Sequence, residues 1–298
     1  MREILVISGK GGTGKTSLTA AFAHLAERPI LCDLDVDAPD LHILLDPKPR
    51  QTNEFWSGCE ARIDPEKCTA CGDCYERCQF GAITEGADAY RVDPLRCEGC
   101  SVCVHFCPAE AIAFDEKMCG EWYLSDTDLG PMVHAQLGPA EENSGRLVTL
   151  LRQEAKKLAE ENDHDLILCD GPPGIGCPVI SSLAQVSMAV IVTEPTPSGL
   201  HDLERVADLC RHFKVPAGIV VNKWDLNSDM TEKIERLAPE RELRLFGRVD
   251  FDPAFTDAMV QRQTITTFQP DGLGKTVAGI WDAILAAAEE NEKTAEAS

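Results

Sequence analysis

The spacing of the cysteines constrains this chain more than any other feature. Of the 14 cysteines among 298 residues, eight fall between residues 68 and 107. A small secreted chain with so many cysteines would be expected to form disulfides, but a longer chain with no signal-peptide layout at its start is better explained by metal ligation. The eight cysteines repeat the pattern Cys-x2-Cys-x2-Cys-x3-Cys twice, first as Cys68, Cys71, Cys74 and Cys78 and then as Cys97, Cys100, Cys103 and Cys107.

Each cysteine run resembles that of the bacterial-type ferredoxins, which hold two [4Fe–4S] clusters. In that family the fourth cysteine of a run binds the other cluster. Zinc is the alternative, although zinc sites favour two Cys-x2-Cys pairs with a longer spacer. We therefore expect a small inserted α+β ferredoxin-like domain over residues 59–116. The resemblance implies that Cys68, Cys71, Cys74 and Cys107 hold one cluster and that Cys97, Cys100, Cys103 and Cys78 hold the other.

A glycine-rich loop follows the apolar run at residues 2–8, which predicts a buried parallel strand. Residues 9–16 match the pattern GxxxxGK[ST], in which backbone N–H groups surround phosphates. Lys15 is expected to reach the β- and γ-phosphates and Thr16 to ligate Mg²⁺. The expected nucleotide-binding residues here are Gly9, Gly11, Gly12, Thr13, Gly14, Lys15, Thr16 and Ser17.

Lys10 places a lysine at the second position of this loop. With it, the sequence resembles the MinD/ParA/Mrp-like ATPases with a deviant Walker A motif (the SIMIBI class), which include the nitrogenase iron protein. In these dimeric ATPases the lysine reaches the nucleotide of the facing subunit. The resemblance implies that role for Lys10, and a homodimer or a heterodimer with a related ATPase.

Two aspartate-rich strand ends resemble further motifs of that family. Asp33 and Asp35 lie in a segment similar to switch I, where the second aspartate orients the attacking water and the first supports the Mg²⁺ water shell. Asp170 ends an apolar run and resembles the Walker B aspartate on Mg²⁺. Aspartates after a strand also serve simple turn chemistry. The resemblance implies Lys10, Lys15, Asp35 and Asp170 as catalytic residues and Thr16, Asp33 and Asp170 as the Mg²⁺ residues.

A base-reading loop is indicated at residues 222–225, where Asn222 and Asp225 belong to an NKxD-like segment. In GTPases the aspartate reads guanine, whereas in MinD-like proteins the asparagine contacts adenine. The resemblance favours ATP, and the motif itself leaves GTP open.

Strand-like and helix-like segments alternate outside the cysteine runs, which predicts an α/β fold. We expect a P-loop NTPase with a mostly parallel sheet and helices on both faces, formed by residues 1–58 and 117–290. The last helix is expected near residues 273–290, followed by a flexible acidic tail at 291–298.

The formal net charge of −22 limits the class of partner. It argues against nucleic acid and against an anionic membrane, and it suits a basic protein partner or simple solubility. No apolar run approaches the roughly 18 residues that a membrane span needs. A cytoplasmic protein is the expectation.

The motifs together predict an ATP-hydrolysing iron–sulfur protein. ATP-driven closure of a dimer would be coupled to electron transfer through two [4Fe–4S] clusters to a redox or cofactor-carrier protein. One alternative is an ATP-dependent scaffold for iron–sulfur or molybdenum cofactors; another is a MinD/ParA-type spatial organiser, which the acidic charge disfavours. A third cluster, shared between subunits through Cys177, is a further hypothesis.

Overall fold

The computed structural model describes residues 1–139, 141 and 145–296. Contacts within the chain separate two compact units. The main unit comprises Met1–Asn53, Trp122–Leu137 and Glu142–Ser298, and the cysteine-rich unit comprises Glu54–Glu121 and Gly138–Glu141. The cysteine-rich unit therefore begins at Glu54 rather than at residue 59 and leaves at Glu121 rather than at residue 116.

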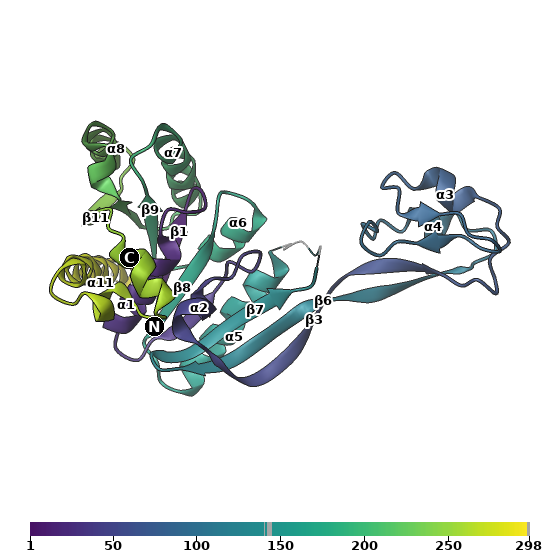
Figure 1. Cartoon of the computed structure of the whole chain (residues 1–298), viewed down its shortest axis with the longest axis horizontal. Coiled ribbons are helices and arrows are strands. Elements are labelled where there is room, and N and C mark those ends of the chain that lie inside the picture. The colour runs from purple at the N-terminus through teal and green to yellow at the C-terminus, as the bar shows by residue number, and fades with distance from the viewer. Residues whose placement is uncertain (140, 142–144, 297–298) are drawn as a thin grey trace. The chain divides into compact units, whose positions relative to one another are not determined.

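A nine-stranded sheet forms the centre of the main unit, in the order β11-β10-β9-β1-β8-β2-β7-β6-β3 (Figure 1). The pairs from β11 through to β7 are parallel. This confirms the expected α/β fold with a mostly parallel sheet. In chain order the strands are β1 (Arg2–Ser8), β2 (Ile30–Asp33), β3 (Lys48–Ile63), β6 (Ile112–Thr127), β7 (Gly130–Leu137), β8 (Leu166–Pro173), β9 (Met188–Thr193), β10 (Ala217–Asn222) and β11 (Arg244–Val249).

Helices cover both faces of this sheet. On one face Ile4 of β1 packs in the same buried cluster as Phe22 and Trp281, whose rings stack at 5.2 Å. On the other face Glu3, the neighbour of Ile4, accepts two hydrogen bonds from Arg152. The helices of the main unit are α1 (Lys15–Leu25), α2 (Leu41–Leu45), α5 (Arg146–Glu161), α6 (Cys177–Leu183), α7 (Pro197–His212), η1 (a 3₁₀ turn, Trp224–Leu226), α8 (Ser228–Glu240), α9 (Ala254–Val260), α10 (Ile265–Phe268) and α11 (Leu273–Glu296).

The last helix is longer than expected from the sequence. α11 continues to Glu296, whereas the sequence predicted an end near Glu290 and a flexible tail. The added residues are mostly Ala, Glu and Lys, which favour a helix, and contain neither Gly nor Pro. Residues 297 and 298 lie outside the described part of the chain.

The cysteine-rich unit contains two short helices, α3 (Asp73–Arg77) and α4 (Val102–His105), one in each cysteine run. Strands β4 (Ile83–Thr84) and β5 (Arg91–Val92) pair antiparallel. Its buried cluster consists of Ala61, Cys74, Ile83 and Ile112, with cysteines among the partly buried neighbours. The chain enters this unit along β3 and leaves it along β6.

Candidate functional site

The glycine-rich loop joins β1 to α1 and is crowded at Gly9 and at Gly14. Gly14 has φ +87°, and a Cβ added there would lie 2.4 Å from the Asn222 amide nitrogen. That amide donates a hydrogen bond of 2.7 Å to the Thr13 carbonyl. The end of β10 therefore packs directly on the loop, which places Asn222 beside the nucleotide-binding residues expected from the sequence.

Lys15 lies at the start of α1 and faces the ends of two neighbouring strands. Its Nζ is 3.0 Å from Asp170 Oδ2 and 3.5 Å from Asp35 Oδ2. Thr16 Oγ1 donates to Asp170 Oδ2 at 2.7 Å. Asp33 is the register partner of Asp170 across β2 and β8. The parallel sheet thus gathers residues from three separate motifs at the carboxyl ends of its strands.

Lys15 faces three carboxyl groups in this cluster, and the pKa values of Asp33 and Asp35 are raised there. Burial, and then the charge of Asp170, raises the pKa of Asp33 well above its ordinary value. Burial also raises the pKa of Asp35 to about 6, although Lys15 opposes this. Burial tends to lower the pKa of Lys15, but the nearby aspartates raise it overall. The cluster has an excess of negative charge that an added cation would relieve.

The donor set fits Mg²⁺, which prefers carboxylate, hydroxyl and water oxygens. Asp33 Oδ2 is buried and makes no hydrogen bond within the described residues. Asp170 is the register partner of Asp33, and Thr16 donates a hydrogen bond to Asp170. Magnesium bound with a nucleotide would therefore draw on Thr16, Asp33 and Asp170.

Thr19 belongs to the same cluster but was missed by the sequence analysis. Its hydroxyl group donates to Asp170 Oδ1 at 2.9 Å and is fully buried. Thr19 lies four residues after Lys15, so helical spacing was the signal that could have found it.

Lys10 does not join the Lys15 cluster. Its Nζ lies 2.5 Å from Glu194 Oε1, just after β9. Glu194 was also missed by the sequence analysis. Like Asp33 and Asp170, it lies near the carboxyl end of a buried parallel strand, which is the position where such sites gather.

The segment that resembles a base-reading loop makes contacts within the chain. Lys223 Nζ donates to the Gly12 carbonyl at 2.9 Å, and Asn222 lies against Thr13 as described. Asp225 Oδ1 instead accepts a hydrogen bond of 2.7 Å from the Phe251 N–H. One oxygen of Asp225 is therefore already engaged.

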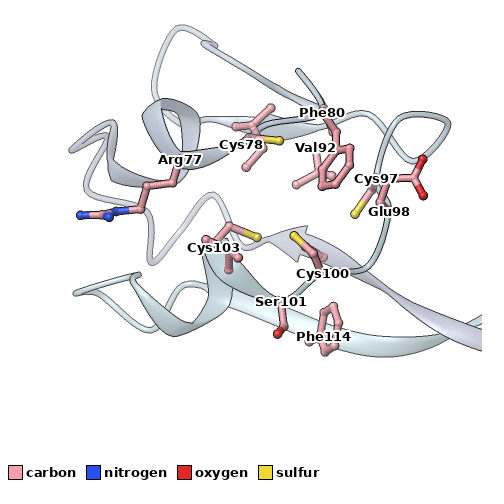
Figure 2. Close-up of a pocket in the computed structure, with 14 residues that line it drawn as sticks. Arg77, Cys78, Phe80, Val92, Cys97, Glu98, Cys100, Ser101, Cys103 and Phe114 are labelled. Carbon is pink, nitrogen blue, oxygen red and sulfur yellow. The ribbon is translucent and has the colours of Figure 1, made fainter.

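The cysteine-rich unit contains two pockets, each lined by four cysteines. One has an empty volume of ≈ 390 Å³, including space open to solvent, and the other ≈ 310 Å³. Figure 2 shows the sulfur atoms of Cys78, Cys97, Cys100 and Cys103, which line the first pocket, around a common space. The first pocket is lined by Cys78, Cys97, Cys100 and Cys103, and the second by Cys68, Cys71, Cys74 and Cys107. In each pocket, three cysteines of one run meet the fourth cysteine of the other run.

The chemistry of these pockets fits a [4Fe–4S] cluster, in which each of four thiolates binds a different iron. Apolar side chains complete the walls, including Phe114 in the first pocket and Ile112 in the second. Burial raises the pKa of Cys74 to about 11 and also raises that of Cys103. Thiolates are the binding form, so loading would release protons. Among the described residues, the structure shows no group of three or more His, Cys, Asp or Glu side chains that could hold a metal ion.

Other cysteines lie apart from the two pockets. Cys32 and Cys169 are buried register partners on β2 and β8, and Cys210 is buried on α7. Cys177 is exposed at the start of α6. A shared cluster at Cys177 remains a prediction. No helix in the described part of the chain is long and apolar enough to cross a membrane.

Comparison with known proteins places this geometry in a family. The sequence model of the CobQ/CobB/MinD/ParA nucleotide binding domain matches residues 4–265. The uncharacterized protein MJ0578 of Methanocaldococcus jannaschii is 34% identical over 230 residues, which are 76% of this chain and 79% of that protein. The septum site-determining protein MinD of Synechocystis is 25% identical over 253 residues, 83% of this chain and 73% of its own length.

A solved structure has the same fold over nearly its whole length. The cell division ATPase MinD of Pyrococcus furiosus matches with a TM-score of 0.56 and 18% identity, covering 96% of this chain and 98% of that one. At this identity the likeness shows the fold alone. The match to the family spans most of the sequence, and the chain therefore belongs to the CobQ/CobB/MinD/ParA nucleotide-binding family.

Proposed function

We propose that this protein hydrolyses ATP and that closure of its dimer controls electron transfer through two [4Fe–4S] clusters in the cysteine-rich unit. The observation that carries the proposal is the pair of four-cysteine pockets in a chain that also has a complete phosphate-binding loop. A bound [4Fe–4S] cluster would supply a one-electron centre.

Hydrolysis needs a residue to position water and others to hold the phosphates. Lys15 would leave its contacts with Asp35 and Asp170 for the β- and γ-phosphates, which its flexible side chain permits. Asp35 would then be free to orient the attacking water. Thr16, Asp33 and Asp170 would hold Mg²⁺, which neutralises phosphate charge when bound. Lys10 would act on the nucleotide of the facing subunit.

ATP is favoured over GTP by the resemblance to MinD-like ATPases. Asp225 Oδ1 already accepts a hydrogen bond from the Phe251 N–H. Guanine reading would have to share the acceptor sites of this carboxylate with that contact. Binding competition between ATP and GTP tests this, and equal affinities would contradict it.

The order of strands offers a physical route for coupling. β2 ends at Asp33 and is hydrogen-bonded between β8 and β7. β6 and β3 continue the sheet beyond β7, and both carry the chain into the cysteine-rich unit. A nucleotide-driven shift at Asp33 would therefore act on strands that lead to the clusters. Coupling of ~1–3 kcal/mol would move a one-electron potential by roughly 40–130 mV.

The decisive experiment is an anaerobic redox titration of the iron-loaded protein with no nucleotide, with Mg·ADP and with Mg·ATP. We expect about eight irons per chain, as two cubanes require, and potentials that shift by tens of millivolts with ATP. The coupling would be contradicted if the reduction potentials of the clusters were the same with and without nucleotide and the ATPase rate did not depend on the oxidation state of the clusters. Iron or molybdenum that leaves the chain on ATP addition would favour the scaffold function instead.

A spatial organiser is the second candidate, and the relation to MinD favours it. It requires ATP-dependent binding to a membrane or a nucleoid. Co-sedimentation with anionic vesicles and with DNA, with and without Mg·ATP, separates the two functions. The net charge of −22 leads us to expect no binding to either. We further propose a cytoplasmic protein with a basic redox or cofactor-carrier partner.

A further inference from the structure

The lysine that distinguishes this phosphate-binding loop is fully engaged within its own chain. Lys10 Nζ lies 2.5 Å from Glu194 Oε1. The same amine donates to Ser198 Oγ at 3.1 Å and to Thr196 Oγ1 at 3.4 Å. A lysine ammonium has three donors, and the segment from the end of β9 into the first turn of α7 supplies three acceptors. Lys10 therefore has no donor left for a nucleotide in another subunit.

Glu194 also binds a second lysine that touches the loop. Its Oε2 lies 3.3 Å from Lys223 Nζ, which in turn donates to the Gly12 carbonyl. Burial tends to raise the pKa of Glu194, but the hydrogen bonds from Lys10 and Lys223 hold it below its ordinary value. The carboxylate is thus charged at neutral pH. Its side chain is 17% exposed and that of Lys10 is 31% exposed, so the contact is only partly screened by solvent.

We propose that Glu194 is a latch that holds Lys10 in its own subunit and opposes dimer closure until bound ATP draws the lysine across. This inference rests on the proposed function, in which Lys10 acts on the facing nucleotide. The amine cannot keep these three contacts and reach another subunit at the same time. Because closure must break the contact between Lys10 and Glu194, the free energy of this contact reduces the net free energy gained on dimer closure. Glu194 thereby raises the protein concentration at which dimers form.

Replacing the carboxylate tests this. Glu194→Gln keeps the size of the side chain and removes its charge. Dimers should then form with Mg·ATP at about three- to tenfold lower protein concentration, the range expected when two partly exposed ion pairs, one in each subunit, no longer oppose closure. Analytical ultracentrifugation over a concentration series measures this. Glu204→Gln is the matched control, because it removes an equal charge from α7, where Glu204 pairs with Arg241. An unchanged or higher dimerisation concentration in Glu194→Gln, or an equal fall in Glu204→Gln, would overturn the proposal.

A second measurement needs neither a variant nor a dimer. An amine-acetylating reagent at limiting dose, followed by mass spectrometry, compares Lys10 with Lys275, which is 73% exposed. In the nucleotide-free wild type, Lys10 should react at least about threefold more slowly than Lys275, since hydrogen-bonded and half-buried amines are protected. Equal rates would show that the latch does not exist in solution. A wild type that hydrolyses no ATP but protects Lys10 would contradict the proposed function while leaving this contact in place.

Discussion

The nucleotide loop and the cysteine pockets are both candidate binding sites, but they are held in place by different means. Lys15, Thr19 and Asp170 are each less than 10% exposed and are joined to one another by hydrogen bonds and ion pairs. They sit on a sheet whose buried cluster extends from β1 to α11. The nucleotide loop is therefore shaped by the protein before any ligand binds.

The pockets have much less protein support. The cysteine-rich unit buries one cluster of four residues, and one of these is the proposed ligand Cys74. Below roughly 70–80 residues a hydrophobic core rarely stabilises a fold alone, and metals or disulfides usually assist it. None of the described cysteines in this unit forms a disulfide. Under the proposed function, bound clusters would hold this unit together, whereas the main unit holds its own site.

The largest expected effect separates the two units by their dependence on iron. Cys97→Ser removes one proposed ligand, and metal binding of this kind carries on the order of 10 kcal/mol of folding free energy. Proteolysis within residues 54–121 should then rise by about a hundredfold, while the main unit still binds Mg·ATP, with a change in affinity no larger than the proposed coupling of ~1–3 kcal/mol. Limited proteolysis with mass spectrometry measures the first and fluorescent-nucleotide titration the second.

Cys177→Ser is the matched control, because Cys177 is also a free thiol but lies in the main unit and outside both pockets. Cys177→Ser should change neither the rate of proteolysis within residues 54–121 nor the affinity for Mg·ATP. A cysteine-rich unit that resists protease equally well in Cys97→Ser would show that its own packing suffices.

The two regions also differ in what the sequence could predict. The crosswise sets of cysteines that line the pockets were predicted from the resemblance to bacterial-type ferredoxins, and the motif that carries this resemblance is local, since three cysteines of a run lie within seven residues. The phosphate-binding loop is equally local. Glu194 was missed because it lies far from Lys10 in the sequence and belongs to no motif. Only the order of β9 and β1 in the sheet brings these two residues together.

The ribbon that carries the chain between units was missed for another reason. β3 and β6 are each 16 residues long and mix glycine, charged and apolar residues without a clear period of two. β7 contains Pro131, which argues against a strand by local preference alone. Pairing within the sheet outweighs these local signals. The cysteine-rich unit therefore begins at Glu54, before the expected residue 59, and extends to Glu121, beyond the expected residue 116.

The second prediction concerns the three carboxyl groups that lie close together in the nucleotide site. Asp33→Asn removes a buried carboxyl group whose Oδ2 makes no hydrogen bond in the described structure. We expect the nucleotide-free main unit to become more stable by about 1–2 kcal/mol, because one of three crowded carboxyl groups is gone. Mg·ATP affinity should fall roughly tenfold or more, because Mg²⁺ loses a charged oxygen. Thermal unfolding and titration with Mg·ATP measure the two changes, and lower stability together with unchanged affinity would contradict both parts.

The third prediction uses the pKa of Asp35. This value is raised to about 6, so the folded protein holds a proton that the unfolded chain, with an ordinary carboxyl pKa of 3.8, releases earlier. The contribution of Asp35 to stability is therefore greatest below about pH 4 and is lost as the pH rises through about 6. The sign is opposite to that of a salt-bridged carboxylate.

For hydrolysis, the ionised form of Asp35 is the one that can orient water. The value of kcat/KM for ATP, which reports the nucleotide-free protein, should therefore fall about tenfold per pH unit below pH 6 and level off above it. The Asp35→Asn variant should hydrolyse ATP slowly at every pH and should not show this fall below pH 6. Steady-state rates between pH 5 and 8 measure this, and an acid limb that persists in Asp35→Asn would assign it to another group.

The smallest expected effect tests how tightly the protein shapes the nucleotide loop. Gly14→Ala places a methyl group at φ +87° and 2.4 Å from the Asn222 amide, so the hydrogen bond to Thr13 must shift. We expect a loss of about 1–2 kcal/mol of stability and a several-fold loss of nucleotide affinity. Gly11→Ala is the matched control within the same loop, because an added Cβ there meets nothing within 4 Å and the backbone needs no positive φ. Equal losses in both variants would mean that the loop is sensitive to any side chain, and that its shape comes from the bound nucleotide rather than from its packing against β10.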